Sequence, residues 1–195
     1  MYFTRRIALL FLTLSMLGLG QSTVAQPENP TSSNPSSESE CPGGISEQFL
    51  LGGQVVNPKT FTLSQLQALP SSQVTVILTG QGAQTHTYVG VTLWTLIQAA
   101  GGLKPNPDPT VKNGSLRQYI AIDATDCYKV VLSEGEIDPK FEAKQVLVAY
   151  ATNDDPLQGP KLLGDEGIAR LVVPGDFSGG RYVSNIRRIQ VRSAQ

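Results

Sequence analysis

The sequence predicts an α+β fold with mixed or antiparallel sheet. Short runs rich in β-branched residues are separated by glycine, proline and asparagine turn signals along most of the chain. Two segments show clear helical spacing of leucines, and a third helical signal is very short. Strands and helices do not alternate regularly, which argues against a parallel βαβ sheet, and no solenoid-type repeat is present.

Two helices are predicted from apolar residues at helical spacing, over residues 61–70 and 91–102. In the first, Thr62 and Gln65 have the three-residue spacing of a capping box, which marks a helix start. Near the end of the second, Gly101 suits the left-handed position that commonly closes a helix. Each helix therefore has a boundary signal of its own.

The strands are predicted where β-branched and aromatic residues gather between turn signals. They cover residues 74–80, 85–90, 117–124, 128–133, 145–152, 168–174 and 187–192. The third and fourth of these are close enough to form a hairpin across residues 125–127. Directly after the hairpin, Ser133 and Glu136 predict a capping box for a single helical turn over 133–137.

Residues 1–25 have the order of an export signal. Two arginines precede an apolar run over 7–19, and small residues follow up to Ala25. The run has 13 residues, whereas a membrane-spanning helix needs about 20, so a cleaved signal peptide is favoured over an anchor. We therefore expect an exported protein, periplasmic or extracellular, with no membrane span after cleavage. The paired arginines leave both the general and the twin-arginine export routes open.

The next segment, residues 26–42, is predicted to be a disordered linker. It contains proline, serine, asparagine and glutamate without a large apolar residue, so it cannot offset its chain entropy by burial. One domain over 43–195 follows and is long enough for a hydrophobic core. Residues 41–195 carry 13 basic and 13 acidic residues. That balance gives no electrostatic reason to expect nucleic acid or an anionic membrane as a partner.

The residue types leave little room for common metal or nucleophile chemistry. A zinc site needs three or four ligands, and the chain has one histidine, His86, and two cysteines far apart. His86 lies in a predicted strand without a nucleophile motif nearby, so we interpret it as a strand residue and not a catalytic base. Asp123 and Asp126 lie at a turn, where aspartate is common for local reasons. We predict no metal site and no catalytic residue.

The glycine-rich segment PGDFSGGR, residues 174–181, has two interpretations. Successive glycines let backbone N–H groups face one concavity, where Arg170 and Arg181 have the charge to complete a site for a small anionic ligand. A plain connection between two core strands has the same composition. Both interpretations stay open at this point.

Cys127 lies in the predicted hairpin turn, and Cys41 lies at the end of the predicted linker. Two cysteines in an exported protein favour a disulfide between them, which would attach the linker to the hairpin. No histidine is placed near Cys127 to activate it as a nucleophile, and Lys129 alone follows closely. A metal ligand and an inert thiol are the remaining alternatives.

Five segments in order resemble the molybdopterin-binding domain of the sulfite oxidase family of oxidoreductases. They are FLLGGQVVNPKTFTLSQLQALP (49–70), YVGVTLWTLIQAAG (88–101), DATDCYKVVLS (123–133), QVLVAYATNDDPL (145–157) and RLVVPGDFSGGRYVSNIRRIQV (170–191). The resemblance extends over about residues 48–192 and implies the α+β fold of that family. It also implies molybdopterin as the cofactor and oxidoreductase activity.

The resemblance also indicates which position of the sequence would hold a molybdenum ligand. Enzymes of the family hold molybdenum through the pterin dithiolene and one cysteine thiolate, which follows a strand of the pattern V-x-V-x-C-x-G. Placed on VTVILTG (74–80), this pattern puts Leu78 at the cysteine position and Gly80 at the glycine position. Leucine has no ligand atom, so molybdenum is not expected. If a pterin is bound, the resemblance predicts that residues in and after the predicted strand 168–174 contact it. These are Arg170, Gly175, Gly179, Gly180 and Arg181.

Three functions remain in competition. The first is a non-catalytic exported domain that binds a small anionic ligand or a periplasmic protein. The second is a molybdopterin-dependent oxidoreductase with altered metal ligation, through Cys127 or a ligand other than a thiolate. The third is a structural or assembly module. An open concavity beside Gly179 favours a binding function, whereas a filled one favours the structural module.

Overall fold

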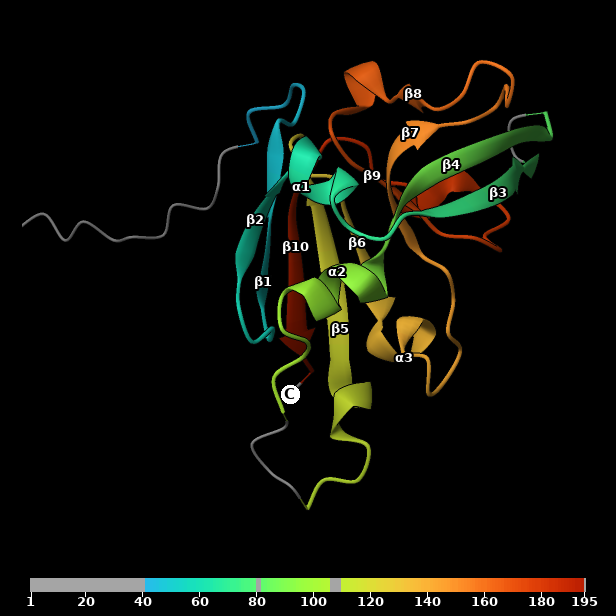
Figure 1. The fold of residues 1–195 in the computed structure, drawn as a ribbon. Coiled ribbons are helices and arrows are strands. Elements are labelled where there is room, and N and C mark those ends of the chain that lie inside the picture. Colours follow the sequence, from blue (N-terminus) through green and yellow to red (C-terminus); the bar gives the residue numbers. More distant parts are fainter. Residues whose placement is uncertain (1–40, 80–81, 106–109, 195) are drawn as a thin grey trace, which may run out of the picture. The chain divides into compact units, whose positions relative to one another are not determined.

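The computed structural model describes residues 41–79, 82–105 and 110–194. They form two five-stranded sheets with short helices packed against them (Figure 1). The fold is α+β, as predicted, with one parallel strand pair among antiparallel ones. The predicted signal peptide and nearly all of the predicted linker lie outside the described residues.

The first sheet has the strand order β2-β1-β10-β5-β6. Its strands are β1 (Gln48–Gly53), β2 (Lys59–Thr62), β5 (Gln118–Ala124), β6 (Lys129–Ser133) and β10 (Ile186–Ser193). The last strand of the chain, β10, is central because it pairs in parallel with β1 and antiparallel with β5. The hairpin between β5 and β6 is confirmed.

The second sheet is antiparallel and is built around β7. Its strands are β3 (Ser72–Leu78), β4 (Gln84–Thr92), β7 (Leu147–Thr152), β8 (Lys161–Leu162) and β9 (Arg170–Val172). β4 pairs with β7 along one side, and β8 and β9 pair with different parts of β7. The second sheet therefore brings both ends of the 161–172 segment against β7.

Within the described residues, three short α-helices and three 3₁₀ turns connect the strands. They are α1 (Leu63–Gln67), α2 (Leu93–Ala99), α3 (Glu134–Ile137), η2 (Gly114–Arg117), η3 (Gly164–Glu166) and η4 (Gly179–Arg181). The capping boxes predicted at Thr62 and at Ser133 are both present. The first two helices are shorter than predicted at both ends. Thr62 and Thr92 are strand residues that act as N-caps, and the helices end at the C-caps Ala68 and Ala100.

A single cluster of buried apolar side chains joins the two sheets, with α1 and α2 contributing leucines to it. Gly90 lies at a bulge between β4 and β7, where close packing leaves no room for a side chain. A Cβ atom at Gly90 would lie 2.3 Å from the carbonyl oxygen of Val148, so no larger residue fits without backbone movement. In the described part of the chain, no helix has the length and apolarity to cross a membrane.

Glu134, on α3, has an ionisable side chain that is fully buried. Burial and the neighbouring carboxyl group of Asp138 raise the pKa of Glu134 to about 7, and Ser115 and Lys140 offset this only in part. The folded state therefore holds a proton on Glu134 that the unfolded chain releases at lower pH. Since the unfolded state binds fewer protons between pH 4.5 and about 7, stability falls as the pH rises through that window.

The substitution Glu134→Gln should remove this loss, because the amide is neutral at every pH. Relative to the natural protein, the variant should gain about 2–3 kcal/mol of unfolding free energy between pH 5 and pH 8. Urea unfolding at the two pH values measures the gain, and Glu47→Gln at an exposed position is the control. Parallel pH profiles for the natural protein and Glu134→Gln would show that Glu134 does not titrate as described.

Candidate functional site

The segment that joins β9 to β10 carries the residues predicted to bind a ligand. Arg170 is the first residue of β9, on the second sheet. Gly175 follows in an exposed loop with a φ angle of +86°, where nothing crowds its Cα. Gly179, Gly180 and Arg181 form the turn η4, before the chain joins the first sheet at β10. The predicted residues therefore lie along a single crossing between the sheets.

A pocket of about 390 Å³ lies at Arg170, and we call it the Arg170 pocket. Every strand of the second sheet contributes to its wall. The lining residues are Leu78, His86, Tyr88, Thr152, Asp154, Lys161, Leu162, Leu163, Glu166 and Arg170. The wall combines an apolar part with two basic and two acidic side chains, so it suits a small polar ligand more than an apolar one.

Leu78 connects the Arg170 pocket to the glycine turn. Its side chain is 7% exposed and ends β3. A Cβ atom at Gly179 would be 3.9 Å from Cδ2 of Leu78, so the two residues are in contact distance. The space immediately beside Gly179 is thus occupied by side chains, which on the criterion given above favours the structural module. The Arg170 pocket, which Leu78 also lines, is a separate, open cavity, and a binding function rests on that cavity.

Arg170 is held by two aromatic rings and one carboxylate. Its Cζ atom lies 5.7 Å from the ring centroid of Tyr88 and 5.9 Å from that of Tyr182, which are cation–π distances. Its Nη1 donates to Glu166 Oε1. Nε of Arg170 is buried and makes no hydrogen bond within the described residues. The guanidinium is therefore fixed in position yet retains an unused donor.

Burial raises the pKa of Tyr88 and of Tyr182, and the positive charge of Arg170 only partly opposes the effect. Both phenols therefore stay neutral at physiological pH and present π faces to the cation. The hydroxyl group of Tyr182 donates to the carbonyl oxygen of Val173 at 3.2 Å, which fixes the ring.

His86 and Asp154 form a second polar pair in the Arg170 pocket. Nδ1 of His86 lies 3.0 Å from Oδ2 of Asp154, and the Thr87 amide donates to Oδ1 at 2.7 Å. Burial alone would raise the pKa of Asp154, but these two hydrogen bonds outweigh it and lower the pKa. His86 is a strand residue, as predicted, and it lies on β4 beside a carboxylate rather than beside a nucleophile.

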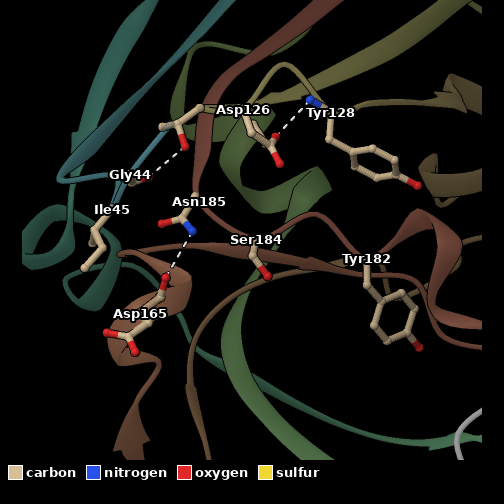
Figure 2. Close-up of a pocket in the computed structure, with 10 residues that line it drawn as sticks. Gly44, Ile45, Asp126, Tyr128, Asp165, Tyr182, Ser184 and Asn185 are labelled. Atoms are coloured by element: carbon tan, nitrogen blue, oxygen red, sulfur yellow. Dashed lines mark hydrogen bonds between the residues drawn. The ribbon is translucent and has the colours of Figure 1, made fainter. Parts of the chain in front are cut away.

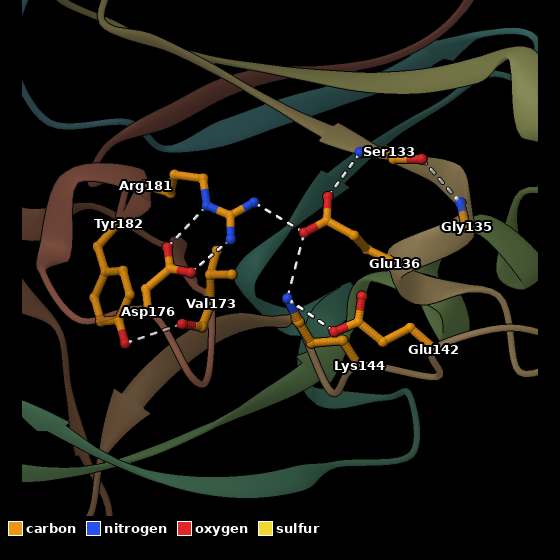
Figure 3. Close-up of polar contacts among 9 residues, drawn as sticks. All are labelled: Ser133, Gly135, Glu136, Glu142, Lys144, Val173, Asp176, Arg181 and Tyr182. Carbon is orange, nitrogen blue, oxygen red and sulfur yellow. Dashed lines mark hydrogen bonds and ion pairs between the residues drawn. The ribbon is translucent and has the colours of Figure 1, made fainter.

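Arg181 is not in the Arg170 pocket, because its guanidinium is turned toward α3 (Figure 3). Nε and Nη2 donate to the two carboxylate oxygens of Asp176 at 2.8 and 2.5 Å, and Nη1 donates to Glu136 at 3.0 Å. Lys144 donates to the same Glu136 oxygen at 3.3 Å. The Asp176 hydrogen bonds raise the pKa of Arg181 above its ordinary value. The network attaches the glycine-rich loop to α3.

The predicted disulfide is present, and it joins Cys41 to Cys127 with their Cα atoms 5.3 Å apart. It fixes residues 41–45, which we call the strap, beside the β5–β6 turn. The strap forms one wall of a second pocket of about 390 Å³, the strap pocket (Figure 2). The remaining wall consists of Ala124, Thr125, Asp126, Tyr128, Asp165, Tyr182, Ser184 and Asn185.

Sequence reasoning missed five residues that shape the Arg170 pocket: Tyr88, Tyr182, Asp154, Lys161 and Glu166. The two tyrosines stand next to glycine motifs, in YVG and GGRY, and an aromatic residue beside such a motif is the signal that could have found them. The two acids gave no signal, since each lies in a stretch of ordinary turn residues.

Comparison with known proteins agrees with this fold. The family model described as "Oxidoreductase molybdopterin binding domain" matches residues 46–195. The chain belongs to this family. Among solved structures, sulfane dehydrogenase SoxCD from Paracoccus pantotrophus is similar, with a TM-score of 0.57 and 23% sequence identity. The match covers 78% of this chain and 40% of that chain, so the likeness is one of fold to part of a larger protein. No curated protein matches significantly.

The described residues do not fit a molybdenum ion held by a protein thiolate. Such a site needs a cysteine sulfur facing the pocket, and both cysteines are joined in the disulfide. Leu78 presents only carbon atoms to the Arg170 pocket. In addition, the described part of the chain has no group of three or more His, Cys, Asp or Glu side chains arranged for a metal. The assignment of Arg170, Gly175, Gly179, Gly180 and Arg181 to a pterin stays a prediction.

The substitution Arg181→Met should destabilise the protein, because it leaves Asp176 and Glu136 without their shared cation. For half-buried carboxylates we expect a loss of about 1–3 kcal/mol of unfolding free energy. Urea unfolding measures the loss, with Arg192→Met on the exposed end of β10 as the matched control. Equal losses in both variants would show that the network contributes nothing specific.

Proposed function

We propose that this chain is an exported, non-catalytic member of its family that binds a small anionic ligand in the Arg170 pocket. The observation that carries the proposal is the pairing of an open pocket with Leu78 in its wall. By resemblance to the family, Leu78 occupies the position of the metal-binding cysteine. A site that keeps its cavity and an arginine but offers no soft ligand is suited to binding rather than to molybdenum chemistry.

The ligand class follows from the charges in the pocket. Lys161 and Arg170 are the basic lining residues, and Asp154 and Glu166 are the acidic ones. Asp154 is already engaged by His86 and the Thr87 amide, whereas Glu166 is the partner of Arg170. An anionic group entering the pocket therefore competes with Glu166 for the guanidinium and gains Lys161 as a second cation.

Two features support export. Residues 1–25 have the composition of a cleavable signal. The Cys41–Cys127 disulfide belongs to a type of bond that persists mainly in oxidising compartments outside the cytosol.

Metal and pterin analysis separates the proposal from a molybdenum enzyme with altered ligation. The protein should be produced in a host that makes the cofactor, exported, and analysed for molybdenum and for pterin fluorescence. We expect less than about one tenth of an equivalent of molybdenum, since no thiolate is offered as a ligand. Near-stoichiometric molybdenum would overturn the non-catalytic assignment, and Cys41→Ser with Cys127→Ser would then show whether either sulfur holds it.

Anion binding tests the pocket directly, with inorganic sulfate and phosphate as probes in calorimetric titrations. Arg170→Gln should weaken binding about tenfold or more, because it removes the cation. Glu166→Gln should strengthen binding by roughly tenfold, because it removes the competing carboxylate. Arg192→Gln, far along β10 from the pocket lining, is the control. Binding that is absent in the natural protein and in Glu166→Gln would favour the structural-module function instead.

A further inference from the structure

The Cys41–Cys127 disulfide joins two parts of the molecule that differ in how firmly they are held. Cys41 is exposed at the start of the strap, and Cys127 is half-buried in the β5–β6 turn. Attack on a disulfide needs an accessible sulfur and a good leaving thiolate on the other side. Cys41 is on the exposed side of the bond, and Arg187 lies beside the sulfur of Cys127.

The turn that holds Cys127 is fixed without the disulfide. The Cys127 amide donates to the Ala124 carbonyl at 3.1 Å, and the Ala124 amide donates to the Tyr128 carbonyl at 2.9 Å. Asp126 accepts from the Tyr128 amide at 2.9 Å (Figure 2). Cys127 has a φ angle of +67°, a left-handed conformation that these hydrogen bonds maintain. Breaking the disulfide therefore leaves the backbone that carries Cys127 in place.

The strap is held less firmly. The Gly43 amide donates to the Thr125 carbonyl at 3.0 Å, and the Thr125 hydroxyl donates to the Gly44 carbonyl at 2.7 Å. Its side chains are exposed, with Ile45 at 60%. Two glycines with positive φ give the strap high conformational entropy once released. After the strap, Ser46 is buried and its amide donates to Oδ1 of Asn185, so the segment that is released ends at Ile45.

Arg187, on β10, supplies the stabilisation of the leaving group. Its Nη2 atom lies 3.5 Å from Sγ of Cys127 and is placed to donate to it. A guanidinium beside a sulfur favours the thiolate over the thiol, which makes that sulfur the better leaving group.

We propose that Cys41–Cys127 is a thiol–disulfide exchange site for a dithiol reductant, and that reduction releases the strap from the strap pocket. A thiolate of the reductant attacks Sγ of Cys41, the S–S bond breaks, and Cys127 leaves as a thiolate beside Arg187. The second thiol of the reductant then displaces Cys41, which takes up a proton. The reductant ends as a disulfide, having given two electrons.

Release of the strap alters both cavities that Ile45 lines, the strap pocket and a more apolar one beside Ile168, and it leaves the core intact. Gly44 and Ile45 form one wall of the strap pocket, so their departure exposes the opposite wall, including Tyr182 and Ser184. Neither cysteine belongs to the buried apolar core. The proposal does not depend on anion binding in the Arg170 pocket.

The test uses the full exported protein in dithiothreitol redox buffers. Alkylation and intact mass should show two new thiols in protein that stays folded. Hydrogen exchange of the strap amides should then rise by about tenfold or more, while amides of β5 and β10 keep their protection. The double substitution Cys41→Ser with Cys127→Ser should reproduce the rise without reductant.

The role of Arg187 has its own readout, the rate of reduction. Arg187→Gln should slow reduction by roughly threefold to tenfold, and Arg192→Gln on the same strand should not. Strap amides that stay protected after reduction would overturn the proposal. Loss of protection across β5 and β10 would also overturn it, because the disulfide would then be a structural staple. Both outcomes can be read on the reduced natural protein even where a variant fails to fold.

Discussion

The passage of the chain from β9 to β10 is the constraint on which both pockets depend. This passage takes the chain from the second sheet to the first, and backbone hydrogen bonds hold both of its ends. The Leu171 amide donates to the Val183 carbonyl at 2.8 Å, and the Asn185 amide donates to the Glu166 carbonyl at 2.7 Å. Because both ends are fixed, the intervening loop must project, and ion pairs from Arg181 hold it there.

The two arginines at this passage, Arg170 and Arg181, have different kinds of partners. Arg181 has a structural role, because three of its N–H groups already donate to the carboxylates of Asp176 and Glu136. Arg170 is flanked by aromatic faces and has a single carboxylate partner, Glu166, so its charge is less completely balanced. The two rings keep the guanidinium oriented, and Glu166 is the carboxylate that an incoming anion has to displace.

Local signals in the sequence predicted the local structure. The capping boxes at Thr62 and Ser133, the hairpin before β6 and the Cys41–Cys127 bond were all found from residue type and spacing. The strands β1, β2 and β8 were absent from the strands predicted by residue pattern. β2 and β8 have four and two residues, too few for a period, and β1 has no β-branched residue. The surroundings of Arg170 and Arg181 were missed for another reason. Tyr88 lies 82 residues before Arg170 on β4, and Glu136 lies 45 residues before Arg181 on α3, so no local pattern specifies these contacts.

One side chain links the two pockets. Tyr182 lines the strap pocket, and its ring is also one of the two that flank Arg170. Its hydroxyl is fixed on Val173, so the ring cannot leave one pocket without disturbing the other. The chain therefore has one cavity that Tyr182 lines and another whose Arg170 contacts the ring of Tyr182. Neither requires a metal for its shape, because backbone pairing, ion pairs and a disulfide build them. Under the proposal that Leu78 stands at the ligand position, a fold associated with cofactor chemistry keeps its cavities without the cysteine.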